Sequence, residues 1–466
     1  MANAVPIRAV PAPPPASAGL ELSELLSALS HALDLTEGQP EGHCIRCCWI
    51  GTAVGREIGL SEPELWELYY TLLLKDVGCS SNAARICQLY LTDDLTFKHD
   101  VKTVRDNIPE LLRFVASHTA PAAGMVERLR TLLGVMQRSG EIANEVIVTR
   151  CERGADVARQ LRFSERVADG IRNLDEHWDG KGQSTGARGD KIPIFAQIAL
   201  LAQIVDVFNT GTGREAAMVE LNYRAGTWFN PALVRQFERA AARPGFWETL
   251  NAPDLEVTVL ELEPARHAKI LDEDFIDDIT EAFAQVVDSK SPYTSGHSSR
   301  VAEFAGLIAA ELHLSEPRCR LVRRAALLHD IGKLGVSNMI LDKPGKLTPE
   351  EWVSVRAHAA ITERILSRIH AFGEIARVAG AHHERLDGKG YPRRLRGDEI
   401  SLETRVVTAA DVFDALTAKR PYRDAIPLER ALAIMQGEVG TAIDADCLAA
   451  LKAVLAKRQP LVALSA

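Results

Sequence analysis

The segment LVRRAALLHDIGKL, residues 321–334, decides the fold class of this chain. Its apolar residues recur at spacings of three and four, the repeat of one face of an α-helix. The segment RVVTAADVFDALTA, residues 405–418, has the same pattern, and comparable segments follow one another from Leu20 onward. We therefore predict an all-α protein. A short extended piece is expected only at LEVTVLEL, residues 255–262, where apolar and polar residues partly alternate.

The last third of the chain is rich in residues that bind transition metals. Five histidines and two aspartates of this kind fall within helical pattern: His297, His329, Asp330, His358, His382, His383 and Asp411. Imidazole and carboxylate groups in that number suit two neighbouring ions, which indicates metal-dependent hydrolysis. Adjacent residues on a helix point about 100° apart, so Asp330 can reach between two ions while His329 holds one of them.

Lys333 completes the predicted chemistry. It lies three residues after Asp330 and four after His329, spacings that place side chains on the same face of a helix. Its ammonium is therefore expected to meet a phosphate bound at the metals. We predict Asp330 and Lys333 as the catalytic residues.

Length and charge limit the other classes of function. At 466 residues the chain is long for one hydrophobic core, which favours two or three domains. The formal net charge of -9 argues against binding of polymeric nucleic acid and against a membrane-surface role, but permits a basic pocket for a small anion. We expect no apolar run of membrane-spanning length and no secretion signal, so the predicted location is cytoplasmic.

The eight cysteines are expected to be reduced thiols in the core, since most lie within apolar helical pattern. The cluster formed by His43, Cys44, Cys47 and Cys48 leaves open a zinc or redox site. Against that alternative, no second pair of cysteine and histidine ligands follows at zinc-finger spacing.

The two halves of the chain resemble each other. GHCIRC at Gly42 matches GHSSRV at Gly296, LLLKDVG matches ALLHDIG, EHWDGKG matches ERLDGKG, and IVDVFN matches AADVFD. The offset between matched residues is 297 - 43 = 254 at the front, and later 387 - 179 = 208 and 411 - 206 = 205. One helical fold used twice, with an insertion in the first copy between Asp76 and Asp179, explains these offsets.

The predicted domain organisation follows from this repeat. Residues 1–18, rich in proline and alanine, form a disordered tail; 19–245 form the first domain, 246–270 a linker, and 271–460 the catalytic domain. First-domain positions aligned with the ligands read His43, Lys75, Asp76, Arg150, Leu174, Asp175 and Asp206. Lysine and arginine in place of imidazoles repel metal cations. The first domain is therefore predicted to be degenerate and non-catalytic, with a role in regulation, dimerisation or partner binding.

Two strings carry a family resemblance. His329-Asp330-Ile331-Gly332-Lys333 and HHERLDGKGYP, residues 382–392, resemble the HD-GYP group of the HD phosphohydrolase superfamily, which is named for the tripeptide found here as Gly390-Tyr391-Pro392. The resemblance covers residues 272–455 strongly and 25–245 in degraded form. It implies an all-helical domain with a bi- or trinuclear metal centre, often of iron or manganese. It also implies hydrolysis of the bacterial second messenger cyclic di-GMP to linear pGpG, to GMP, or to both.

The resemblance further implies how the ligands divide. His297, His329, Asp330 and Asp411 would hold one metal, and Asp330 would bridge to a second one completed by His358, His382 and His383. Some members add a third metal through a glutamate four residues before the first histidine; that position is Tyr293 here, so two divalent ions, iron or manganese, are expected. The expected substrate contacts are Lys333, Asp414, Arg420, Arg423, Gly390 and Tyr391. Arginine forks suit phosphate oxygens, although Arg420 and Arg423 also fit a solvated basic turn.

Two other functions stay open. The metals also suit a phosphohydrolase of another nucleotide, because HD-type centres act on many phosphoesters. They also suit a receptor that binds cyclic di-GMP, changes the arrangement of its two domains and signals to a partner. Independently of the function, the first domain is a possible site for a homodimer or a signalling partner. The intact ligand set favours the enzyme, since binding alone does not need seven metal ligands.

Overall fold

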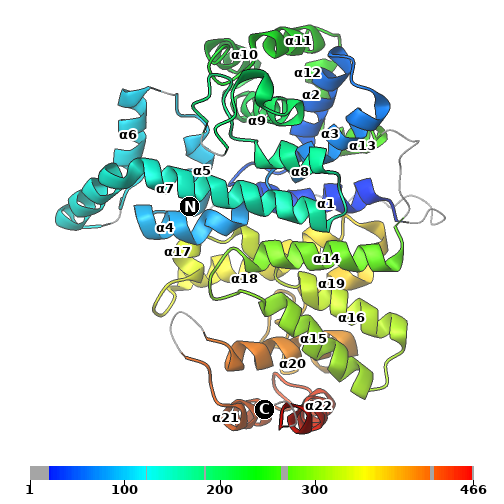
Figure 1. Cartoon of the computed structure of the whole chain (residues 1–466). Coiled ribbons are helices and arrows are strands. Elements are labelled where there is room, and N and C mark those ends of the chain that lie inside the picture. The colour runs from blue at the N-terminus through cyan, green and yellow to red at the C-terminus, as the bar shows by residue number, and fades with distance from the viewer. Residues whose placement is uncertain are drawn as a thin grey trace.

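The computed structural model describes residues 20–105, 107–121, 123–182, 185–263, 271–419 and 424–463, which are mainly helical (Figure 1). Within these ranges the only β-structure is isolated bridges, so the all-α prediction is confirmed. The extended piece predicted over 255–262 is wrong, because helix α13 (Leu255–Glu261) forms there and buries Leu255 and Val259 at helical spacing. The predicted tail, 1–18, lies outside the described residues.

The first half of the chain supplies the upper part of the molecule in Figure 1. Its elements are α1 (Leu22–Thr36), α2 (His43–Glu57), α3 (Glu62–Leu74), η1 (Cys79–Asn82), α4 (Ala83–Tyr90), α5 (Asp94–Val101), α6 (Ile108–His118), α7 (Met125–Gln160), α8 (Glu165–Arg172), η2 (Gly189–Lys191), α9 (Ile194–Thr212), α10 (Arg214–Tyr223), α11 (Pro231–Ala241), α12 (Phe246–Leu250) and α13. Helices α12 and α13 pack against α2. Most of the described part of the interval predicted as a linker, 246–270, therefore folds with the first half.

The second half supplies the lower part of the molecule (Figure 1). Its elements are α14 (Glu273–Asp288), α15 (His297–Glu311), α16 (Glu316–Leu328), η3 (Ile331–Gly335), α17 (Asn338–Leu341), α18 (Pro349–Leu366), η4 (His370–Phe372), α19 (Gly373–Gly380), η5 (Gly397–Glu399), α20 (Leu402–Thr417), α21 (Leu428–Gly437) and α22 (Ala445–Ala463). Helix α15 packs against α16 and α20, as α2 packs against α3 and α9 in the first half.

Two glycines mark equivalent close approaches in the two halves. A Cβ atom added at Gly332 would overlap the carbonyl oxygen of His358 in α18, and one added at Gly78 would overlap that of Arg150 in α7. Only glycine lets the two backbones approach this closely. The insertion in the first half therefore lies between Gly78 and Arg150, where α4, α5, α6 and the projecting start of α7 are found (Figure 1).

The two halves share one hydrophobic core. A single cluster of buried side chains extends from Leu22 to Leu451. Helix α1 is buried along nearly its whole length and packs against η3 and α18 of the second half, while α14 packs against α7 and η1 of the first. Separating the halves would expose this apolar surface to water, so the arrangement around η3 and α18 depends on both.

Helix α9 is a central element of the first half. It is long and apolar enough to cross a membrane by length and composition, with a mean hydropathy of 1.4, so the expectation that no run reaches this length is wrong. It packs between α2, α8 and α10, and 72% of its apolar window is buried inside the protein. Core burial alone is sufficient to explain this composition.

Candidate metal centre

The seven ligand-type side chains predicted from the sequence converge between five elements of the second half. His297 begins α15, His329 and Asp330 follow α16, His358 lies in α18, His382 and His383 follow α19, and Asp411 lies in α20. All of them except His383 are buried. Residues separated by more than a hundred positions in sequence therefore share one enclosed polar cluster.

One part of the cluster surrounds Oδ2 of Asp330. This atom lies 3.5 Å from Nε2 of His297 and 3.2 Å from Nε2 of His329. Oδ1 of Asp411 lies 3.4 Å and 3.9 Å from the same two nitrogens. Ligands bound to one ion at about 2.1 Å stand roughly 3.0–3.5 Å apart, depending on the coordination geometry. The four groups therefore enclose a volume suited to one cation.

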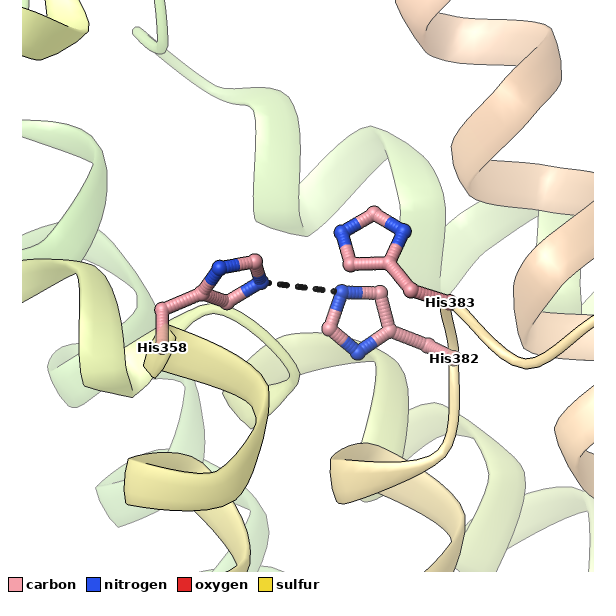
Figure 2. A group of neighbouring side chains, drawn as sticks. All are labelled: His358, His382 and His383. Carbon is pink, nitrogen blue, oxygen red and sulfur yellow. Dashed lines mark hydrogen bonds between the residues drawn. The ribbon is translucent and has the colours of Figure 1, made fainter. Parts of the chain in front are cut away.

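The other part of the cluster surrounds Oδ1 of Asp330. This atom lies 3.4 Å from Nε2 of His358 and 3.8 Å from Nε2 of His382. The two nitrogens are themselves 3.3 Å apart, and His383 lies beside them (Figure 2). Donor atoms of the three histidines all fall within 4.8 Å of one another. Asp330 thus turns a different oxygen toward each group, which is the bridging arrangement expected of it.

Hydrogen bonds on the far side of the rings fix how the histidines point. In three of them Nδ1 donates to the carbonyl oxygen three residues earlier: His329 to Ala326 at 2.7 Å, His358 to Val355 at 2.5 Å, and His382 to Ala379 at 2.6 Å. With the proton on Nδ1, each Nε2 presents a lone pair to the cluster. The Nε2 atoms of His358 and His382 then face each other as two acceptors, which a cation between them would reconcile.

The residues fit divalent metal ions. Nε2 of His297, Nε2 of His329 and Oδ1 of Asp330 are buried and have no hydrogen-bond partner among the described residues. Such atoms cost free energy unless something binds them. Burial lowers the pKa of His358 to about 4 and that of His383 to about 3, so both rings are neutral near pH 7, the form that binds metals.

Lys333 reaches the centre by a route that differs from the prediction. Helix α16 ends at Leu328, and Lys333 lies in the 3-10 helix η3, so no continuous α-helix joins it to His329. The tighter 3-10 turn still brings residues three apart together. Nζ of Lys333 donates to Oδ2 of Asp330 at 2.5 Å, and its side chain is 22% exposed. It therefore lies between the cluster and the solvent.

Asp414 lies behind His297 instead of facing the open side of the site. Its Oδ2 accepts from Nδ1 of His297 at 2.6 Å, and its Oδ1 accepts from Nε of Arg300 at 2.6 Å. The carboxylate is buried and both oxygens are used, so we assign it to positioning His297 and not to substrate contact, which corrects the prediction for this residue. Arg420 and Arg423 lie outside the described residues.

Replacing Asp414 by asparagine is expected to weaken metal binding about 10- to 100-fold, because an amide nitrogen cannot accept from His297 or Arg300. The measurement is metal content against free metal concentration for the purified chain. Asp444→Asn is the matched control, since Asp444 also pairs with an arginine, Arg405, but outside the cluster. Equal metal affinity in the D414N and wild-type proteins would contradict the assignment.

The loop after α19 forms a wall beside the second group of ligands. A Cβ atom at Gly390 would lie 2.5 Å from the amide nitrogen of Arg385 and 2.6 Å from the carbonyl oxygen of His383, so only glycine fits. The ring of the next residue, Tyr391, packs 4.8 Å from that of His383. Contact of Gly390 and Tyr391 with substrate stays a prediction.

Matches to known proteins are found in both halves of the chain. Residues 131–233 and 281–447 match the HD domain family. This chain belongs to the HD domain family. It is 54% identical over 434 residues to the 3'3'-cGAMP-specific phosphodiesterase 3 of Vibrio cholerae, covering 93% of this chain and 94% of that protein. It is also 41% identical over 170 residues, 36% of its length and 45% of the relative's, to the cyclic di-GMP phosphodiesterase response regulator RpfG of Xanthomonas campestris.

A solved structure supports the fold of the whole HD chain. The crystal structure of the cyclic GMP-AMP specific phosphodiesterase V-cGAP3 of V. cholerae matches with a TM-score of 0.65 and 48% sequence identity, covering 94% of this chain and 98% of that one. The similarity therefore includes both halves and is not confined to the HD domain that carries the seven ligands.

In the first half of this HD protein, Lys75 stands where His329 stands in the second. Its Nζ lies 3.0 Å from Nε2 of His43, donates to Oε1 of Gln203 at 3.2 Å, and is paired with the carboxylate of Asp76. The side chain is buried. An ammonium group thus lies among the atoms that would face the first metal, and its charge opposes a cation at His43 and the neighbouring cysteines.

The predicted alignment of Asp206 with Asp411 is wrong. Asp206 accepts from Nδ1 of His43 at 2.6 Å and from Nε of Arg46 at 2.6 Å, the two contacts that Asp414 makes in the HD domain of the second half. The offset is therefore 414 - 206 = 208, as at Asp387 and Asp179. Asp411 and Asp414 are one turn apart on α20. Matching the letters D-V-F of the two segments therefore shifted the alignment by one helical turn.

The corrected alignment removes another ligand from the first half. Gln203 now aligns with Asp411, so only His43 and Asp76 keep the same residue as the aligned ligand, while Asp175 puts a carboxylate at the position of His383. Arg150, at the position of His358, is paired with Asp175 through both carboxylate oxygens. Sequence reasoning missed the positioning role of Asp414, although the arginine and aspartate repeated in both halves, Arg46 with Asp206 and Arg300 with Asp414, were a signal for it.

Proposed function

We propose that this protein is a metal-dependent phosphodiesterase of cyclic dinucleotides and that 3'3'-cGAMP is its preferred substrate. The observation that carries the proposal is the position of Asp330, whose two oxygens face two separate groups of metal-ligand atoms. Similarity of 54% identity to a 3'3'-cGAMP-specific phosphodiesterase along nearly the whole chain supports the choice of substrate. Cyclic di-GMP is the second candidate, because of the similarity to a cyclic di-GMP phosphodiesterase.

The ligands divide into two proposed sites. His297, His329 and Asp411 with Asp330 would hold one divalent ion, and His358, His382 and His383 with Asp330 the other. Such ions supply Lewis acidity, which activates water and neutralises charge on a phosphodiester. Iron or manganese suits this mixture of imidazole and carboxylate ligands. Hydrogen bonds from Nδ1 to backbone carbonyl oxygens hold the rings of His329, His358 and His382 in place, so little reorganisation is needed when the metals bind.

Lys333 is the proposed catalytic partner of Asp330. Its ammonium lies at the solvent side of the cluster, where the phosphoryl group of a substrate would meet it. There it would stabilise negative charge on the non-bridging oxygens as the bond to the 3' oxygen breaks. The first product would be a linear dinucleotide.

We also propose that the first half is non-catalytic and binds no metal, because the positively charged side chains of Lys75 and Arg150 occupy the positions that histidines occupy in the second half. A homodimer, or a signalling partner held by this half, stays a prediction. Light scattering coupled to size-exclusion chromatography would test for the dimer.

A substrate panel tests the proposed function. The full-length chain, loaded anaerobically with Fe(II) or with Mn(II), is incubated with 3'3'-cGAMP, cyclic di-GMP and cyclic di-AMP, and the products are separated by chromatography. We expect the value of kcat/KM for 3'3'-cGAMP to exceed that for the other two by about 10-fold or more, a ratio equivalent to about 1.4 kcal/mol. Binding without turnover would favour the receptor, and turnover of none of the three would favour another nucleotide.

A further inference from the structure

An exposed aromatic and cationic group lies beside the metal centre. The guanidinium carbon of Arg356 is 5.5 Å from the ring centre of Trp352 and 5.6 Å from that of Tyr391. Arg356 and Trp352 are one turn apart on α18, the helix that carries His358, and Tyr391 belongs to the loop that packs on His383. We name Trp352, Arg356 and Tyr391 the rim cluster. It connects the second group of metal ligands to the surface.

The charge of Arg356 is not used inside the protein. Several arginines of the second half have carboxylate partners, for example Arg318 with Glu403, Arg393 with Glu363, and Arg405 with Asp444. Arg356 has ring contacts but no ion pair within the described residues. Its side chain is exposed, and that of Trp352 is 43% exposed. A large exposed ring next to an unpaired guanidinium is suited to binding a ligand from solution.

These properties match a purine base. Aromatic side chains stack on bases of any sequence, and an arginine fork donates to O6 and N7 of guanine together, whereas adenine presents a donor at the O6 position. Both rings lie near the guanidinium carbon, at 5.5 Å and 5.6 Å from their centres, and a guanidinium carries its N–H donors in a fixed planar fork.

We propose that the rim cluster is a base-binding subsite that selects guanine: Trp352 stacks on one purine of the cyclic dinucleotide and Arg356 reads its O6 and N7 edge. The proposal rests on the proposed function and adds a specificity determinant to it. While the scissile phosphate lies at the metals, the base of a neighbouring nucleotide reaches the rim. The subsite therefore favours substrates that contain at least one guanine.

The test compares Arg356→Ala and Trp352→Ala with the wild-type full-length chain, using cyclic di-GMP, 3'3'-cGAMP and cyclic di-AMP. Dissociation constants and steady-state constants are both measured. R356A is expected to raise Kd and KM for the two guanine-containing compounds about 10-fold, with less than about 2-fold change for cyclic di-AMP. W352A is expected to raise them for all three, because stacking does not distinguish purines. In both variants kcat should stay near the wild-type value, since the contact is made equally before and during reaction.

Arg364→Ala is the matched control, because Arg364 is also exposed and lies two turns further along α18. It removes the same charge from the same helix and should leave all constants unchanged. Unchanged metal content in each variant shows that the centre is intact. Equal Kd values in R356A and wild type, or an equal loss for all three compounds in R356A, would overturn the guanine subsite.

Binding data separate this proposal from the proposed function. If the wild-type chain binds cyclic dinucleotides without cleaving them, the phosphodiesterase assignment fails while the Kd values still decide the subsite. If it cleaves them and R356A behaves as wild type, the subsite fails and the phosphodiesterase stands. A wild-type chain that neither binds nor cleaves any of the three overturns both.

Discussion

Replacing Asp330 by asparagine is expected to abolish turnover and to empty the metal centre. Oδ1 of Asp330 faces His358 and His382, while Oδ2 faces His297 and His329. An asparagine keeps one neutral oxygen and turns an N–H₂ group toward the other set of ligands, so it cannot bridge two cations. Turnover should fall on the order of 1,000-fold or more, and metal content from about two ions per chain to less than one.

The control for this variant is Asp274→Asn, an exposed aspartate on α14 that lies outside the cluster. Both proteins are compared for metal content by plasma emission spectroscopy, for hydrolysis of 3'3'-cGAMP, and for helix content by far-UV circular dichroism. Retained helical signal with lost metal and activity is the expected result for D330N. An active D330N enzyme, or one that keeps both ions, would remove the basis of the proposed function.

The cluster of ligand-type residues was predictable because these residue types are rare and their spacing is helical. Histidines in the core are few, and a histidine and aspartate dyad at the end of an apolar helix has few structural uses besides binding a cation. The convergence of His297, His358 and Asp411 follows once helices of the predicted length pack around one centre. The repeat was visible as well, because EHWDGKG and ERLDGKG keep the glycines that their turns need.

The errors arose where local pattern leaves several geometries open and only contacts between distant segments decide. Asp411 and Asp414 differ by one turn, and only contacts show that the first faces Nε2 of His297 inside the cluster while the second holds Nδ1 of the same ring. The alternation in 255–262 is equally compatible with a short amphipathic helix, and burial of Leu255 and Val259 against α2 decides for it. The pairing of Arg356 with Trp352 and Tyr391 depends on a loop distant in sequence, so no local pattern predicts it.

Replacing Lys75 by methionine is expected to destabilise the folded chain by about 3–5 kcal/mol. The ammonium of Lys75 is buried and is the partner of Asp76, which is buried too. Removing Lys75 takes away the ammonium that is directly paired with this buried carboxylate. Replacing both residues, Lys75→Met with Asp76→Asn, should recover most of the loss, because a neutral pair has no charge to desolvate. Chemical denaturation followed by circular dichroism measures the difference.

The stability lost in the K75M variant should become smaller as the pH falls. Burial by itself would raise the pKa of Asp76, but Lys75 and Lys102 hold it well below its ordinary value. A carboxyl with a depressed pKa stabilises the folded state above its unfolded pKa of about 4, and this contribution is lost as pH falls. Without Lys75 the pKa of Asp76 rises, so protonation of Asp76 at lower pH stabilises the folded variant. The difference in the free energy of unfolding between wild type and K75M should therefore decrease from pH 7 toward pH 4. A difference that does not change with pH would contradict the role given to Asp76.

Substitutions at Lys75 can also test whether the first half contains a degenerate metal site or only a cluster of charged residues. Lys75→His combined with Gln203→Asp gives the first half the residue types that surround the first ion in the second half, since His43 and Asp76 are already present. If Lys75 stands in for a metal ion, this double variant should bind about one more divalent ion per chain than wild type and should be restabilised by it. If the metal content stays at the wild-type value in a folded double variant, the ammonium of Lys75 is not a substitute for a lost cation, and the resemblance between the two halves is limited to the fold.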